Sequence, residues 1–192
     1  MPMLMTEETG ATGATEILKT EHQNIKDLFR KFDETASDRQ KKSIGDAAIR
    51  EIETQACLAV EVFYPAVRRQ VGERQRIVQA KASHEVARLL IKELKGLSAG
   101  EQYNARFDLL KSSVTQQMDE EEAELIPRVE KSDLDLELLG KEMFQMKSRI
   151  TQNDKKAFLR KTGAITLGVV AAAGVVAWLV SGKSPFKNKD RD

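Results

Sequence analysis

The sequence has few of the residues that cross-link or interrupt a helical chain. Of its 192 residues, only 1 is cysteine and 4 are proline, whereas 32% are charged. The lone cysteine, Cys57, excludes an internal disulfide framework and is typical of a reducing compartment. The start of the chain lacks the basic and apolar stretches of a secretory signal peptide. We therefore expect a helix-rich protein whose globular part stays in the compartment where it is made.

Charge is distributed unevenly along the chain. The net charge is +1, but residues 151–192 hold 8 basic and 3 acidic side chains. Residues 1–150 therefore hold 23 basic and 27 acidic side chains, a balance of −4. Proteins that bind nucleic acid usually present a strongly basic face. The mildly acidic balance of the larger part therefore excludes nucleic acid as an expected partner.

One long stretch without charge, residues 162–182, lies near the end of the sequence. A helix of that length spans about 30 Å, the thickness of a bilayer core. Trp178 lies near one end of the stretch. Basic residues flank it on both sides: Lys155, Lys156, Arg160 and Lys161 before it, and Lys183, Lys187, Lys189 and Arg191 after it. The pattern predicts a single-pass transmembrane helix rather than a buried core helix.

The residues in and around this stretch also suggest an orientation and a possible pairing. Basic residues before the stretch slightly outnumber those after it once Lys147 and Arg149 are included, which favours a cytoplasmic soluble domain. Ala164, Gly168 and Ala172 form a stripe of small residues through which two spans can pack. The sequence therefore predicts a membrane partner and allows a homo-oligomer.

In four segments of the soluble part, mostly apolar residues recur at steps of three and four, so that each segment has one seam of residues expected to face the core. These seams are Leu18, His22, Ile25, Phe29 and Phe32; Ala48, Ile52, Gln55, Ala59, Val62 and Ala66; Ile77, Ala80, His84, Ala87, Ile91 and Leu94; and Tyr103, Phe107, Leu110, Val114, Gln117 and Glu121. This spacing is typical of amphipathic helices. Turn residues separate the segments near Ser37, Gly72 and Gly100. The predicted fold class is all-α, an up-down antiparallel four-helix bundle.

A fifth helix is predicted to follow the four. Ser132 resembles a helix N-cap, with Asp133 and Asp135 in the first turn, and apolar residues follow. The predicted organisation is a disordered N-terminus at 1–14, the helical bundle at 15–150, a basic polar linker at 151–161, the transmembrane helix at 162–182 and a short basic tail at 183–192.

Polar residues occupy some of the seam positions that should be buried. They are His22, Gln55, His84, Gln117 and Glu121. An unpaired buried polar group costs about 1–3 kcal/mol. We therefore expect these five side chains to contact one another, water or a metal ion.

An internal repeat relates the two halves of the predicted bundle. A shift of 62 residues places His22 on His84, Gln55 on Gln117, Ala59 on Glu121 and Pro65 on Pro127. The bundle is therefore predicted to be two similar helical hairpins that share one polar site. The two prolines should end or kink their helices at the same level.

Several short segments together resemble a known family. They are Ile17-Leu18-Lys19-Thr20-Glu21-His22, Glu61-Val62-Phe63-Tyr64-Pro65-Ala66-Val67, Ser83-His84-Glu85, and the run Asp119-Glu120-Glu121-Glu122 that leads to Pro127. Through them, residues 15–150 resemble the hemerythrin-like domain, also called the HHE cation-binding domain. The resemblance implies a four-helix bundle in which four histidines and two bridging carboxylates hold two irons. The resemblance also implies a function of the kind known in this family, whose members bind oxygen, act on nitric oxide or iron, or serve as sensors of such molecules.

The sequence keeps only half of the ligand pattern of this family. The pattern has a histidine in the first helix and His-x-x-x-Glu in the second, and both recur in the third and fourth helices. His22, His84 and Glu121 match it, whereas Gln55, Ala59 and Gln117 stand at the other positions. A glutamine carbonyl is a poor ligand for iron or zinc, and alanine is none. We therefore expect no di-iron centre and at most one iron or zinc ion, held by His22, His84 and Glu121.

Two interpretations of this site remain open. In the first, those three residues hold one metal ion, and the protein is a membrane-anchored metal binder that can bind oxygen or nitric oxide through it. In the second, Gln55 and Gln117 hydrogen-bond the other three in a metal-free polar layer, and the bundle is a scaffold or adaptor for an unknown protein partner. We do not expect an enzyme, because no nucleophile with its base is recognisable. Apart from Glu121, the acidic run 119–124 is expected to be solvated.

Overall fold

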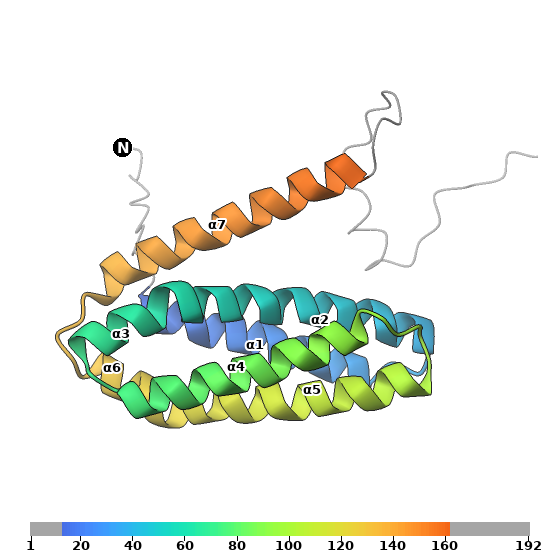
Figure 1. The fold of residues 1–192 in the computed structure, drawn as a ribbon, viewed down its shortest axis with the longest axis horizontal. Coiled ribbons are helices and arrows are strands. Elements are labelled where there is room, and N and C mark those ends of the chain that lie inside the picture. The colour runs from blue at the N-terminus through green and yellow to red at the C-terminus, as the bar shows by residue number, and fades with distance from the viewer. Residues whose placement is uncertain (1–12, 162–192) are drawn as a thin grey trace, which may run out of the picture. The chain divides into compact units, whose positions relative to one another are not determined.

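The computed structural model describes residues 13–161, and all of its regular structure in that range is helical (Figure 1). The helices are α1 (Ala14–Asp33), α2 (Asp38–Leu58), α3 (Tyr64–Gln70), α4 (Arg74–Leu94), α5 (Glu101–Glu120), α6 (Ile126–Glu130) and α7 (Leu136–Lys161). Two single π-helical turns, η1 (Ala59–Phe63) and η2 (Glu121–Leu125), join α2 to α3 and α5 to α6 without a break. The chain divides into a unit that ends at Asp154 and a second unit that begins at Lys155.

The first unit contains the predicted bundle of four antiparallel helices. Helix α1 packs along α2 and helix α4 packs along α5, so the bundle consists of two helical hairpins (Figure 1). The turns lie where the sequence placed them. Gly72 and Gly100 have φ angles of 83° and 143°, a region that favours glycine because it has no Cβ atom.

The two halves of the bundle repeat each other even in their irregular turns. The turns η1 and η2 begin at Ala59 and Glu121, the pair that the shift of 62 residues superimposes. Each turn ends two residues before the proline of its helix, Pro65 or Pro127. A proline ring clashes with the carbonyl four residues earlier, and a wider π turn relieves that clash. The prolines were expected to end or kink these helices, but the helices pass through them by widening one turn.

The start of the fifth helix differs from the prediction in its capping residue. The carboxylate of Asp135 accepts a hydrogen bond from the backbone N–H of Leu138 at 2.9 Å, so Asp135 is the N-cap of α7. The hydroxyl of Ser132 instead donates to the carbonyl of Val129 at 2.7 Å. The predicted cap at Ser132 was therefore wrong, because the cap lies later in the chain, at Asp135. Helix α7 also continues through residues 151–161, where the sequence predicted a linker.

Both predicted terminal segments lie largely outside the described residues. The predicted disordered N-terminus overlaps them only at Gly13 and Ala14, where α1 begins, and the predicted transmembrane helix at 162–182 does not overlap them at all. Within residues 13–161, no helix is both long enough and apolar enough to cross a membrane.

Two apolar clusters fill the bundle on either side of a polar layer. On α1, Leu18 belongs to one cluster and Ile25 to the other, and His22 lies between them. Helix α4 repeats this order with His84 between Ala80 and Ala87. The polar side chains of the seams are buried, as the periodicity predicted: His22, Gln55, His84, Gln117 and Glu121 are each at most 8% exposed. The apolar clusters therefore hold the polar layer at one level of the bundle.

Candidate functional site

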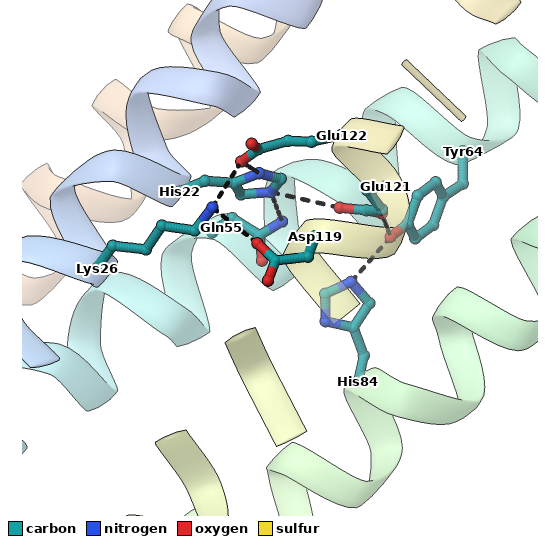
Figure 2. Close-up of polar contacts among 8 residues, drawn as sticks. All are labelled: His22, Lys26, Gln55, Tyr64, His84, Asp119, Glu121 and Glu122. Atoms are coloured by element: carbon teal, nitrogen blue, oxygen red, sulfur yellow. Dashed lines mark hydrogen bonds and ion pairs between the residues drawn. The ribbon is translucent and has the colours of Figure 1, made fainter. Parts of the chain in front are cut away.

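The first part of the polar layer is built around the imidazole of His22. Its Nδ1 lies 2.9 Å from the carboxylate of Glu122, which can only accept, so Nδ1 donates (Figure 2). This bond turns Nε2 toward the interior, where it lies 3.3 Å from Nε2 of Gln55 and 3.3 Å from Oε2 of Glu121. A carboxylate on Nδ1 fixes the orientation of a histidine ring. His22 is therefore held with its second nitrogen facing the centre of the layer.

A surface lysine completes this side of the layer. The ammonium of Lys26 lies 2.9 Å from Asp119 and 3.3 Å from Glu122 (Figure 2). Burial alone would lower the pKa of Lys26, but the hydrogen bonds to Asp119 and Glu122 outweigh it and raise that pKa above its ordinary value. Lys26 thus stays charged and holds the carboxylate that orients His22. Part of the acidic run is therefore engaged with the layer, whereas the sequence analysis expected solvent.

The second part of the layer is a chain of contacts through the phenol of Tyr64. Its hydroxyl donates to Oε1 of Glu121 and lies 3.0 Å from Nε2 of His84 (Figure 2). A hydroxyl has one proton to give, so it must accept its second hydrogen bond from N–H of His84. Burial lowers the pKa of His84, which keeps its ring neutral, and burial together with the charge of Glu121 raises the pKa of Tyr64. The inward nitrogen of His84 therefore carries a proton.

Two buried atoms of the layer have no hydrogen-bond partner among the residues that the structure describes. They are Nε2 of Gln117 and Oε2 of Glu121. The latter lies within ion-pair distance of His22 but does not have the geometry of a hydrogen bond. Gln117 and Glu121 also line a cavity of about 190 Å³, together with Gln79 and Ala80 of α4.

The structure brings some of the predicted site residues together and separates others. His22, Gln55 and Glu121 meet directly, whereas His84 reaches Glu121 only through Tyr64. Within the part of the chain that is described, no three histidine, cysteine, aspartate or glutamate side chains form a group that could hold a metal ion. In this structure His22, His84 and Glu121 are therefore not gathered into one such group.

Sequence reasoning missed the two side chains that contact His22 and His84 from outside the seams, Glu122 and Tyr64. The internal repeat hides Tyr64, because the shift of 62 residues places it on Ile126. The signal available in the sequence was its position directly before Pro65, because a proline inside a helix shifts the faces on which neighbouring side chains lie. Glu122 follows Glu121 in an acidic run, and nothing in the sequence separates it from its solvated neighbours.

The residues present do not fit the di-iron centre that the resemblance implies. Such a centre needs nitrogen and carboxylate donors from all four helices. The amide nitrogen of Gln55 points at His22, and Ala59 is buried without any donor atom. The centre would lack two imidazoles and one bridging carboxylate, and the side chains around the site cannot take their place.

The buried phenols lead to a prediction about alkaline pH. The chain contains two tyrosines, and burial raises the pKa of both Tyr64 and Tyr103. In the unfolded chain a tyrosine ionises near pH ~10. Above that pH the unfolded chain binds fewer protons than the folded one, so the free energy of unfolding should fall as pH rises. Phenolate absorbance should therefore appear together with loss of the helical circular dichroism signal. Reversible ionisation of a tyrosine in the folded protein near pH ~10 would contradict this.

Comparison with known proteins agrees with the fold. The model of the hemerythrin HHE cation binding domain family matches residues 13–129. Among solved structures, the chain is similar to a hemerythrin HHE cation binding domain-containing protein from Mycobacterium kansasii, with 26% identity and a TM-score of 0.66 over 80% of this chain and 95% of that one. A comparison with curated proteins gives no match. Because the family match covers more than half of its length, the chain belongs to the hemerythrin HHE cation binding domain family.

Proposed function

We propose that this protein is a hemerythrin-fold adaptor in which a hydrogen-bonded polar layer takes the place of the di-iron centre. The observation that carries the proposal is the contact of Tyr64 with two ligand positions of the family pattern. Its hydroxyl donates to Glu121 and accepts from His84, so a single phenol provides a partner for both without a metal ion. The proposal assigns no catalytic step to the chain.

The remaining positions of the layer support the same conclusion. Gln55 offers an amide donor to the nitrogen of His22 that would otherwise face a metal, and Glu122 occupies the other nitrogen. A polar network that is largely satisfied within the protein makes a core rigid and specific. In the proposed function, the bundle is therefore a stable body whose surface contacts other proteins.

We also propose that residues 162–182 anchor this body to a membrane, with the bundle on the cytoplasmic side. The support is the uncharged stretch itself and the basic residues on both sides of it. In this arrangement α7 lies directly before the anchor in the sequence and connects it to the bundle.

Two measurements on the full chain, its recovery from membranes and its metal content, test the proposal. The protein should be recovered from the membrane fraction of expressing cells, and recovery only in the soluble fraction would contradict the anchor. After purification in detergent without chelator, and again after anaerobic loading with iron(II) or zinc, it should contain far less than one metal ion per chain. His22→Ala should then leave the metal content unchanged and lower the free energy of unfolding by about 1–3 kcal/mol.

A second candidate function is the binding of a single iron or zinc ion. One observation favours it: Nε2 of His22 and the unpartnered Oε2 of Glu121 lie 3.3 Å apart and face the same space. A cation there would give the buried carboxylate a partner. In that case about one ion per chain should be found, and both His22→Ala and Glu121→Ala should remove it. Such a result would also reopen the binding of oxygen or nitric oxide.

A further inference from the structure

One buried carboxylate lies outside the polar layer and binds α7 to the bundle. The side chain of Glu21 on α1 is only 4% exposed, and charged side chains are rarely buried so deeply unless they are paired. Its Oε1 accepts a hydrogen bond from the ammonium of Lys147 on α7 at 2.5 Å. Its Oε2 is enclosed and has no hydrogen-bond partner within the described part of the chain. Glu21 is therefore paired through only one of its two oxygens.

Around this pair, α7 lies on the bundle as an amphipathic helix. Leu139 and Met143 are 5% and 0% exposed and belong to the same apolar cluster as Leu18 of α1, and Met146 packs partly against it. Together with Lys147 they follow the spacing i, i+4, i+7 and i+8, which places them on one helix face. Phe144, on another face, is 68% exposed. We call the surface that α7 covers, which includes Leu18 and Glu21, the α7 seat.

The α7 seat is better matched to arginine than to the lysine it holds. A lysine ammonium is a compact point charge, whereas the planar guanidinium of arginine donates two parallel hydrogen bonds to both oxygens of a carboxylate. An arginine facing Glu21 would therefore also give Oε2 its missing partner. A helix that carries arginine at this position and keeps the three apolar residues would fit the seat more tightly than α7 itself.

We propose that α7 is a displaceable strap and that its seat binds an amphipathic helix of a partner protein. The partner helix presents apolar residues at i, i+4 and i+7 and an arginine at i+8, and it displaces α7 by satisfying both oxygens of Glu21. This inference rests on the proposed function as an adaptor, for which it names the class of partner. Charge complementarity at Glu21 carries it, because the buried acidic group selects a cationic helix and rejects a neutral or acidic one.

Peptide binding to the full chain in detergent tests the proposal. The probe is a fluorescent peptide of residues 136–153 that carries Lys147→Arg, and the matched controls are the same peptide with the native lysine and with Lys147→Glu. We expect the arginine peptide to bind at least ~10-fold more tightly than the lysine peptide, because charge-assisted bidentate pairs are the stronger ones. The peptide with Lys147→Glu should not bind. Hydrogen exchange of the chain's own residues 136–153 should rise when the arginine peptide is bound.

Variants of the chain itself, checked for their helical circular dichroism signal, separate a change in peptide binding from a defect in folding. Lys147→Ala weakens the internal occupant, so the apparent affinity for the arginine peptide should rise, whereas Lys147→Arg in the chain should lower it. Glu21→Gln should abolish the preference for arginine over lysine while the helical circular dichroism signal is retained. Equal binding of the two peptides, or an unchanged preference in Glu21→Gln, would overturn the proposal. So would dimers in Lys147→Ala, since a second copy would then be the occupant. Metal content does not enter this test, so its failure is distinct from failure of the adaptor function.

Discussion

Restoring the three missing donors should give this protein about two iron ions per chain, the complement of a di-iron four-helix bundle. The variant combines Gln55→His, Ala59→Glu and Gln117→His, and with His22, His84 and Glu121 it completes the family pattern. The physical basis is the internal repeat, because Ala59 and Glu121 begin equivalent π turns and Gln55 and Gln117 lie four residues before them. Elemental analysis after anaerobic iron(II) loading measures the result, and the loaded variant should also unfold at a higher temperature than the metal-free form.

A matched variant separates a rebuilt centre from unspecific iron. It carries the same two histidine substitutions but Ala59→Gln in place of Ala59→Glu, so that volume is kept and the second carboxylate is lost. Its iron content should fall well below that of the complete variant. If the complete variant folds with the native helical content and still binds no iron, then Tyr64 or the backbone, and not the missing donors, prevents assembly of the centre.

Removal of one hydroxyl group, in Tyr64→Phe, should lower the free energy of unfolding by about 3 kcal/mol. The ring of Tyr64 is fully buried and its packing is kept by phenylalanine, so the loss comes from the hydrogen bonds. Without the hydroxyl, Oε1 of Glu121 and the N–H of His84 both lose this hydrogen-bond partner. A buried acceptor that carries charge and has no partner costs more than a neutral one. Urea denaturation followed by circular dichroism measures the effect.

The second tyrosine of the chain provides the control for this prediction. The hydroxyl of Tyr103 donates to Asp46 at 3.0 Å, and the side chain of Asp46 is 40% exposed, so water can replace the lost bond. Tyr103→Phe should therefore cost less than about 1.5 kcal/mol. Adding Glu121→Gln to Tyr64→Phe should recover part of the loss, because the unpartnered group is then neutral. Equal costs for the two single variants would show that Tyr64 does not hold the layer together.

The bundle was predictable because its helices are long and strongly periodic. Nearly all seam residues from Leu18 to Glu121 are buried, although Val62 is half-buried and the neighbouring Phe63 and Tyr64 are buried in its place. The turns near Ser37, Gly72 and Gly100 lie where turn residues interrupt the periodicity. The cap of α7 was not predictable, since several residues around Ser132 are equally good capping types. The two π turns were not predicted either. A proline in a helix signals a local adjustment, but packing around it decides between a break, a kink and a wider turn.

The sequence by itself determined the fold, the internal repeat and the residue types of the polar layer. It also determined that three of the family's donors are absent, because Gln55, Ala59 and Gln117 can be read directly from the matching positions. The tertiary structure decided which of these side chains meet. Contacts between helices depend on the axial position and rotation of each helix, and the π turns change the rotation just before the prolines. Only in three dimensions does the phenol of Tyr64 lie between Glu121 and His84.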